Sequence, residues 1–271
     1  MKCPLYWVDA FTKTRFRGNP AAVVIANRWL DAGLMQAIAR ENNLAETAFV
    51  VAEGDQWAIR WFTPTVEVDL CGHATLASAF ALYQHGLVTG KSIEFASASG
   101  PLHVTRAGDR LALDFPARRA SIRSDLTQSV AEALGCMPAE THKAQATMAV
   151  FGSEDELRSL KPDMDKVGRI PTYGVVATAP GKHADFVSRF FAPQVGVPED
   201  PVTGSTHCTL VPYWSARLGK AQLYAQQLSD RGGELWCEDR GHRVAIAGNC
   251  AMYLTGEIEI GEVGSVTINP Y

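Results

Sequence analysis

Two spacings of hydrophobic residues alternate along the first half of the chain. Leu30, Leu34 and Ile38 recur every four residues, which predicts a helix that ends near Glu41. Residues 73–85 are rich in alanine and apolar on nearly every side, so we expect a helix that is enclosed by sheet. Uninterrupted or alternating apolar runs predict strands at residues 6–12, 21–26, 46–51, 58–63, 102–106 and 111–115.

The second half repeats this plan more loosely. Helices are predicted near residues 125–135 and 205–218, and the second of these resembles residues 73–85 in its apolar character. Pro212 lies inside that pattern and has no backbone N–H, so we expect it to kink the helix or to shorten its first segment. Strands are predicted at residues 145–151, 173–178, 186–191, 223–229, 234–238, 243–248, 251–260 and 265–269.

The repeated plan predicts an α+β fold with two similar domains. Strands that wrap one enclosed helix, twice over, do not follow the strict alternation of a doubly wound sheet. A chain of 271 residues fits two domains of about 130 residues each. We expect the first domain at 1–116, joined by a C-terminal strand at 263–271, and the second at 117–262.

Composition and charge argue against several classes of partner. The net charge is −4 and no long run of Lys or Arg occurs, so neither a nucleic acid nor an anionic membrane is expected. No apolar stretch approaches the length of about 18 residues that a spanning helix needs. The N-terminal residues read as a first strand and not as a signal peptide. The six cysteines are scattered without a C-x-x-C pair, which favours free thiols in the cytoplasm over zinc or disulfides.

A short motif occurs twice, once in each half. Residues 68–75 (VDLCGHAT) and 199–208 (EDPVTGSTHC) each carry an acidic loop that reaches a glycine at the start of a helix. Gly204 follows Gly72 by 132 residues, close to half the chain. A helix N-terminus offers unpaired N–H groups and a positive dipole end. We therefore expect Gly72 and Gly204 to bind the carboxylate of a small anionic metabolite.

Two residues of the first half could move protons. Glu46 opens an apolar strand, where a partly buried carboxyl could exchange a proton near neutral pH; the alternative is a solvated carboxylate. His73 follows the glycine that starts a helix, and this position favours a neutral imidazole that donates a hydrogen bond to substrate. The alternative for His73 is a packed or capping histidine.

Two residues of the second half could contribute to the same chemistry. Asp200 could handle a second proton, orient His73 or hold a substrate amine, although Asp also commonly caps turns. Ser205 could bind a carboxylate through its hydroxyl and backbone, and we do not interpret it as a nucleophile because no His–acid pair is dedicated to it. Cys71 suggests a two-base racemase, but the matching position holds Thr203, which favours a structural role for the thiol.

Long blocks of this sequence resemble the PhzF-like phenazine biosynthesis isomerase family, within the diaminopimelate epimerase-like fold. The resemblance spans nearly the whole chain and its blocks occur in the family's order. They lie at residues 8–11, 18–23, 43–49, 60–75, 191–205 and 207–214.

The resemblance implies two pseudo-symmetric domains, each a mixed, curled, barrel-like sheet around a central helix, with the active site in the cleft between them. It also implies a homodimer that uses no cofactor and no metal. The family's catalytic residues fall on Glu46, His73 and Asp200, its substrate-contacting serine falls on Ser205, and its backbone donors fall on Gly72 and Gly204.

The expected activity is therefore an isomerase that shifts a proton by general acid–base catalysis. The family reaction isomerises trans-2,3-dihydro-3-hydroxyanthranilate, and the sequence does not reveal whether this chain acts on that compound. Two alternatives stay open. One is a racemase or epimerase of an amino acid or hydroxy acid, and the other is a ligand-binding protein that has lost catalysis.

Overall fold

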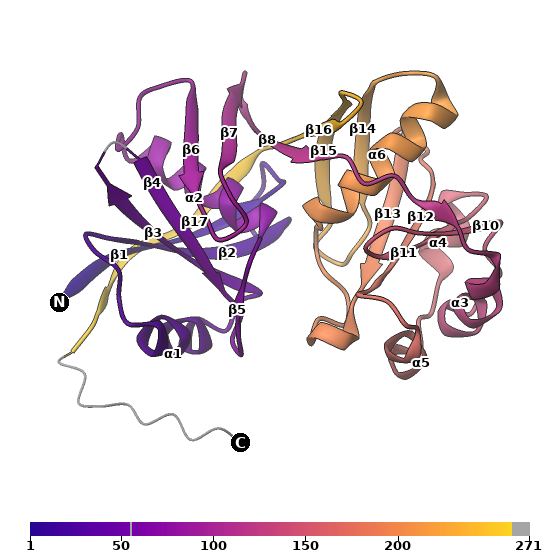
Figure 1. The fold of residues 1–271 in the computed structure, drawn as a ribbon, viewed down its shortest axis with the longest axis horizontal. Coiled ribbons are helices and arrows are strands. Elements are labelled where there is room, and N and C mark those ends of the chain that lie inside the picture. The colour runs from indigo at the N-terminus through magenta and orange to yellow at the C-terminus, as the bar shows by residue number, and fades with distance from the viewer. Residues whose placement is uncertain (55, 262–271) are drawn as a thin grey trace. The chain divides into compact units, whose positions relative to one another are not determined.

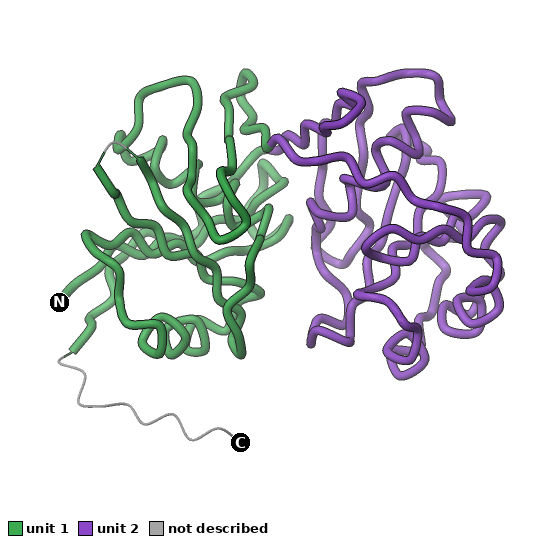
Figure 2. The backbone as a smooth tube through the Cα atoms, in the orientation of Figure 1, with its two compact units in different colours: residues 1–113, 249–271 green, residues 114–248 purple. Residues whose placement is uncertain are grey.

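The computed structural model describes residues 1–54 and 56–261, and these form two compact units (Figures 1 and 2). Among the described residues, unit 1 contains those of 1–113 and 249–261, and unit 2 contains Asp114–Gly248. Each unit is a mixed sheet with a long, largely buried helix, so the expected α+β fold is confirmed.

Unit 1 builds its sheet from both ends of its sequence. The strands β17, β1, β2, β3 and β4 are neighbours in that order, and only the pair β2–β3 among them is parallel. The elements are β1 (Lys2–Ala10), β2 (Asn19–Ala26), α1 (Ala32–Asn42), β3 (Glu46–Glu53), β4 (Gln56–Phe62), β5 (Glu67–Val68), α2 (Gly72–Gln84), β6 (Ser92–Ala96), β7 (Leu102–Ala107), β8 (Arg110–Pro116) and β17 (Cys250–Glu259).

Helix α2 is enclosed as its composition predicts. Nine of its 13 residues are buried, and it contacts β1, β2, β3 and β17. The shorter helix α1 buries Met35 and Ala39 in a cluster that includes Phe49 and Phe62, whose rings meet edge to face at 5.5 Å. The sheet and these two helices thus fix the position at which α2 begins.

The predicted extent of the second domain is wrong at both ends. Residues 114–116 belong to unit 2, and residues 249–261 belong to unit 1 instead of the second domain. The physical reason is a long-range ladder, because β17 pairs antiparallel with β1 from Lys2 opposite Glu259 to Ala10 opposite Cys250. The strand predicted at 263–271 lies outside the described residues.

Unit 2 continues the chain with a sheet in which β11–β12 and β13–β14 are parallel pairs. Helices α3, α4 and α5 pack against one apolar cluster, whereas α6 contacts β14, β15 and β16. The elements are β9 (Ser121–Ile122), η1 (Ser124–Leu126), α3 (Thr127–Leu134), β10 (Glu140–Lys143), β11 (Thr147–Val150), α4 (Glu154–Ser159), α5 (Met164–Arg169), β12 (Val175–Pro180), β13 (Phe186–Phe191), η2 (Pro193–Val195), α6 (Gly204–Leu218), β14 (Gln222–Gln227), β15 (Gly233–Asp239) and β16 (Arg243–Gly248).

Pro212 does not end or shorten helix α6, which runs from Gly204 to Leu218. A proline leaves the carbonyl four residues earlier without its helical donor. That carbonyl belongs to Cys208, and it accepts the backbone N–H of Arg118 at 2.8 Å. The missing helical hydrogen bond is therefore replaced by one from the segment that enters unit 2.

Cysteines occur in both units, mostly at buried positions. All six cysteines are free thiols. Burial raises the pKa of the Cys208 thiol to about 11, so this group is neutral near pH 7. Among the described residues, no helix has the length and apolar character needed to cross a membrane.

Candidate active site

Unit 1 brings together a carboxylate, an imidazole and a thiol. Glu46 is the first residue of β3, and His73 lies in the first turn of α2. The Glu46 Oε2 atom lies 3.2 Å from His73 Nε2, and the side chains are 19% and 8% exposed. On the other side of the ring, Nδ1 lies 3.5 Å from the Sγ atom of Cys71. The structure thus brings the predicted pair of Glu46 and His73 together.

Burial controls the charge of His73. Removal from water lowers the pKa of the imidazole to about 3, while a hydrogen bond with the Pro20 carbonyl acts in the opposite direction. The positive end of α2 also disfavours an imidazolium. His73 is therefore neutral at pH 7 and carries a single ring N–H, which its hydrogen bond to the Pro20 carbonyl already uses.

The two helices that begin at the repeated motif have no side-chain N-cap, a property that they share with α3. The N-cap of α2 is Cys71 and that of α6 is Thr203, and neither side chain accepts a hydrogen bond from the described first turn. In contrast, side-chain oxygens cap the first turn of α1, α4 and α5; these caps are Asp31, Ser153 and Asp163. The first N–H groups of α2 and α6 therefore receive no hydrogen bond from the side chain of their N-cap residue, and that they bind a ligand stays a prediction.

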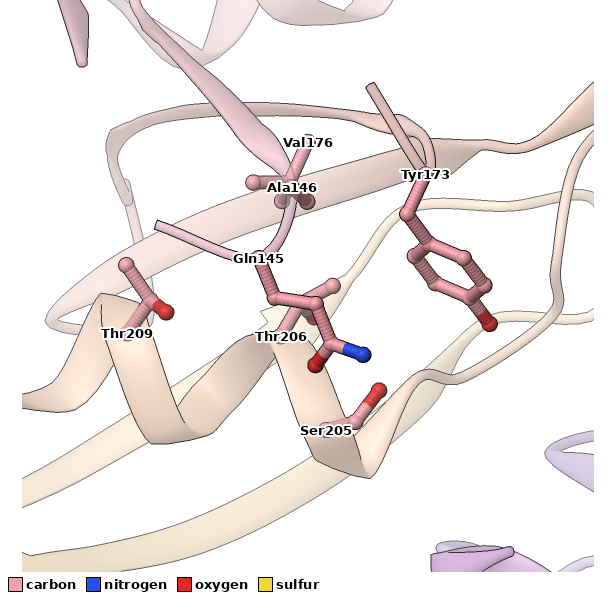
Figure 3. A pocket seen from close by; sticks show the side chains of 7 residues that line it. All are labelled: Gln145, Ala146, Tyr173, Val176, Ser205, Thr206 and Thr209. Atoms are coloured by element: carbon pink, nitrogen blue, oxygen red, sulfur yellow. The ribbon is translucent and has the colours of Figure 1, made fainter. Parts of the chain in front are cut away.

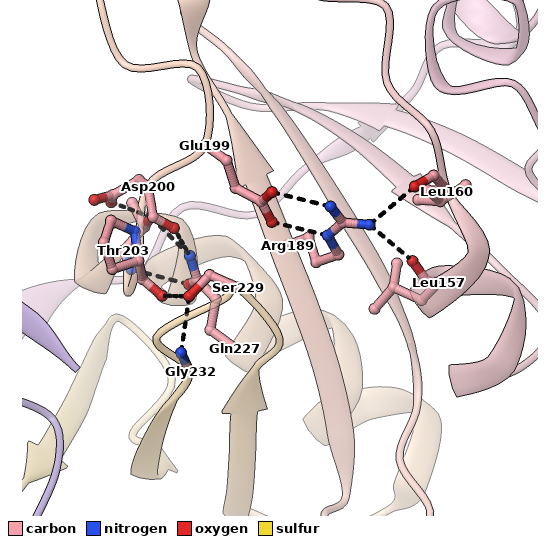
Figure 4. A network of polar contacts seen from close by, with 10 residues as sticks. Leu157, Leu160, Arg189, Glu199, Asp200, Thr203, Gln227, Ser229 and Gly232 are labelled. Carbon is pink, nitrogen blue, oxygen red and sulfur yellow. Dashed lines mark hydrogen bonds and ion pairs between the residues drawn. The ribbon is translucent and has the colours of Figure 1, made fainter. Parts of the chain in front are cut away.

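The Thr203 hydroxyl is directed to Asp200 instead of its own helix (Figure 4). The Gln227 amide donates to Thr203 Oγ1 at 3.2 Å and to the Asp200 carbonyl at 2.8 Å, and it accepts the Thr203 N–H at 2.9 Å. Because Thr203 Oγ1 accepts from Gln227, its single proton points to the Asp200 carboxylate. Gln227 is only 1% exposed, so this arrangement is fixed inside unit 2.

A partly buried ion pair anchors the same loop. Arg189 on β13 donates two hydrogen bonds to the Glu199 carboxylate at 2.8 and 2.9 Å. Its guanidinium also donates to the carbonyls of Leu157 and Leu160, at 3.3 and 3.2 Å (Figure 4). The loop that carries Asp200 is therefore held on both sides, by Arg189 and by Gln227.

Ser205 lines a small pocket at the start of α6 (Figure 3). The sequence predicted this serine, but it did not point to the residues around it. The full lining is Gln145, Ala146, Tyr173, Val176, Ser205, Thr206 and Thr209.

The predicted set divides into one group in each unit. Gly72, His73 and Glu46 lie in unit 1, whereas Asp200 and the Gly204–Ser205 pair lie in unit 2. Two predictions stay untested: that Asp200 orients His73, and that the residues of unit 1 and those of unit 2 act on one substrate. Sequence reasoning missed Gln227, for which the one available signal was a polar residue at an inward-facing position of an alternating strand.

The same three groups of unit 1 could also be considered as metal ligands. One atom each of Glu46, Cys71 and His73 lies within 4.8 Å of the others. However, the carboxylate faces Nε2 while the thiol faces Nδ1, and an ion binds only one of these nitrogens. The geometry therefore favours a proton-transfer group, and the absence of a metal stays a prediction.

Comparison with known proteins identifies the class to which this fold and site belong. A family model described as phenazine biosynthesis-like protein matches residues 8–256. An uncharacterized isomerase of Pseudomonas aeruginosa is 50% identical over 261 residues, which cover 96% of this chain and 100% of that protein. The chain belongs to the PhzF family of phenazine biosynthesis-like proteins.

Solved structures support the same assignment. A PhzF family protein from Enterococcus faecalis superposes with a TM-score of 0.94 at 43% identity, covering 96% of this chain and all of that one. A hydroxyproline epimerase from Agrobacterium vitis superposes with a TM-score of 0.62 at 10% identity, covering 95% of this chain and 92% of that one. This second likeness shows a shared fold alone.

Proposed function

We propose that this protein is a cofactor-independent isomerase that moves a proton within a small, unsaturated carboxylate. The observation that carries the proposal is the Glu46 carboxylate at 3.2 Å from a buried, neutral imidazole at an uncapped helix start. The similarity to proteins that are named isomerases supports it.

In the proposed reaction, the Glu46 carboxylate removes a proton from a carbon next to a double bond. The electron pair of that C–H bond forms a new double bond, and the electrons of the old one move to the far carbon. Protonation of the far carbon, by Glu46 or by a group in equilibrium with it, completes the shift without an oxidant or reductant. Glu46 is thus returned to its starting state.

The remaining groups would hold the carboxylate and stabilise the developing negative charge. We assign this role to the hydroxyl of Ser205 and the backbone N–H groups that begin at Gly72 and Gly204, and to His73, whose ring N–H would turn from the Pro20 carbonyl to the substrate. Fixed donors of this kind need no reorganisation during the reaction. Asp200, oriented by Thr203, would grip a substrate amine or relay a proton.

The Glu46→Gln variant tests the proposal, with Glu41→Gln on the exposed face of α1 as the matched control. The assay measures uptake of solvent deuterium into trans-2,3-dihydro-3-hydroxyanthranilate and into a panel of small unsaturated carboxylates. We expect the rate to fall by about 10²–10⁴-fold in Glu46→Gln, the range of general acid–base catalysis, and to stay normal in the control. Deuterium uptake by Glu46→Gln at the normal rate would remove the proposal.

The same assay addresses the two alternatives. A two-base racemase needs a second thiol, but the matching Thr203 directs its hydroxyl to Asp200. Cys71→Ser should therefore retain deuterium exchange in an isomerase and abolish it in a cysteine-based epimerase. A protein that only binds its ligand would exchange no deuterium in any variant. The homodimer and the absence of a cofactor stay predictions.

A further inference from the structure

The pocket at the start of α6 is small, and all of its lining residues belong to unit 2 (Figure 3). Its cavity volume is about 10 Å³, roughly the space that one water molecule needs. It can therefore receive a single small group, such as an oxygen, but not a ring or a branched chain. Ser205, the predicted carboxylate-binding residue, lies at its edge.

Thr209 gives this pocket a hydroxyl that has no protein partner among the described residues. The residue is 6% exposed, and its hydroxyl forms no hydrogen bond with any residue in the described part of the chain. Two other threonines of the central helices bond back to the start of their own helix: Thr206 donates to the Thr203 carbonyl, and Thr75 donates to the Cys71 carbonyl. The Thr209 hydroxyl has no such bond and can therefore pair with a group that enters the pocket.

Gln145 presents donors to the same pocket. The Arg118 guanidinium donates to Gln145 Oε1, and since Arg offers only donors, the amide oxygen must face Arg118. The amide nitrogen consequently points the other way, and Figure 3 shows it on the side of Ser205 and Tyr173. The backbone of Arg118 is held by its hydrogen bond to the Cys208 carbonyl.

The aromatic ring of Tyr173 lines one side of the pocket. Its ring stacks on Phe190 with centroids 5.9 Å apart and planes 27° apart. The next residue must be a glycine for this contact, because a Cβ atom on Gly174 would lie 2.6 Å from the Phe190 ring. The position of the Tyr173 ring therefore depends on Gly174, in the segment that leads to β12.

We propose that this pocket is a subsite for one hydroxyl or carbonyl oxygen on the substrate, close to the carboxylate that Ser205 binds. Gln145 Nε2 would donate to that oxygen, and the Thr209 hydroxyl would gain its partner. The substrates of this chain are then small hydroxy- or oxo-carboxylates. This inference rests on the proposed function, since it takes the carboxylate site at Gly204 and Ser205 as its reference point.

The test compares matched acids that differ by one hydroxyl. Salicylate and benzoate form one pair, lactate and propionate the other, and binding is followed through the backbone amide signals of residues 204–206 in ¹⁵N-labelled full-length protein. We expect the hydroxylated acid of a pair to bind about tenfold more tightly, the gain of one ordinary hydrogen bond. In Thr209→Val and Gln145→Ala this ratio should fall toward one, whereas the exposed control Thr105→Val should keep it.

The binding ratios and the amide shifts separate failure of the subsite from failure of the carboxylate site. Equal affinities within both pairs, or an undiminished ratio in both variants, would overturn the subsite. Gln145 is exposed, so its variant gives a result even if Thr209→Val does not fold. If none of the four acids shifts the amides of residues 204–206, the carboxylate site fails, and the proposed function fails with the subsite. Binding of both acids without discrimination removes the subsite alone.

Discussion

At the scale of single residues, His207 shows how burial keeps an imidazole uncharged in this fold. Its side chain is fully buried on α6, and Nδ1 lies 2.8 Å from the Thr203 carbonyl. Burial lowers the pKa of the imidazole to about 4, and the hydrogen bond with Thr203 opposes this only in part. His207 is therefore neutral in the folded protein at neutral pH, although it belongs to no proposed catalytic step.

This depressed pKa predicts how stability depends on pH. Below an ordinary histidine pKa of about 6.5, this histidine binds a proton in the unfolded chain but not in the folded protein. The free energy of unfolding therefore falls as the pH drops toward 4. One such group adds a slope of at most about 1.4 kcal/mol per pH unit. Urea unfolding at pH 7, 6 and 5 should show a shallower fall in His207→Gln than in the exposed control His183→Gln. Equal slopes in these variants would contradict the assignment.

Gln227 is expected to act on Asp200 through Thr203. Gln227→Ala leaves the buried Thr203 N–H without its acceptor, which should lower the free energy of unfolding by about 1–3 kcal/mol. Gln227→Glu keeps an acceptor but loses the donors that orient the Thr203 hydroxyl, so it should change the pH profile of turnover with a smaller loss of stability. Gln222→Ala, at the exposed start of β14, serves as the control. A Gln227→Glu profile that superposes on the wild type would limit Gln227 to a structural role.

At the scale of elements, the sequence predicted best the helices whose signal is local. The alanine-rich α2 and the start of α6 follow from composition and from a glycine that opens the helix. Helices α4 and α5 were missed because each has six residues, too few to be stable without the core on which they pack. The strand β6 was missed although its buried and exposed positions alternate, which is a signal that the sequence did contain.

Pro212 illustrates an element whose outcome depends on a distant partner. The kink or shortened first segment predicted from the missing N–H assumed that the Cys208 carbonyl has no other donor, yet Arg118 supplies one, and α6 runs unshortened from Gly204 to Leu218. In Pro212→Ala the new amide would compete for that carbonyl, so the Arg118 amide should exchange with solvent deuterium more rapidly while α6 persists. Exchange measured by NMR checks this, with the Gly219 amide at the end of α6 as an internal reference. Unchanged protection of Arg118 would show that its hydrogen bond does not depend on the proline.

At the scale of the whole molecule, the repeated motif was informative because it is local in each half. Gly72 with His73, and Gly204 with Ser205, are recognisable from a few residues each. The domain boundary could not be recognised in this way, because β17 joins unit 1 by pairing with β1, which lies about 250 residues away along the chain. The pocket lining was hidden for the same reason, since it gathers residues from three separate segments of unit 2.

The proposed function requires both units to respond to one ligand, which gives a prediction at this scale. A single bound carboxylate that contacts both helix starts must produce one binding isotherm, whichever amide reports it. Titration with salicylate should therefore shift the amides of Gly72 and His73 with the same dissociation constant as those of Gly204 and Ser205. Ser205→Ala should weaken the constant measured in unit 1 as much as that in unit 2, whereas Ser92→Ala on exposed β6 should change neither. Two different constants, or a response confined to one unit, would mean that the two motifs serve separate ligands and that Glu46 acts without the α6 N-terminus.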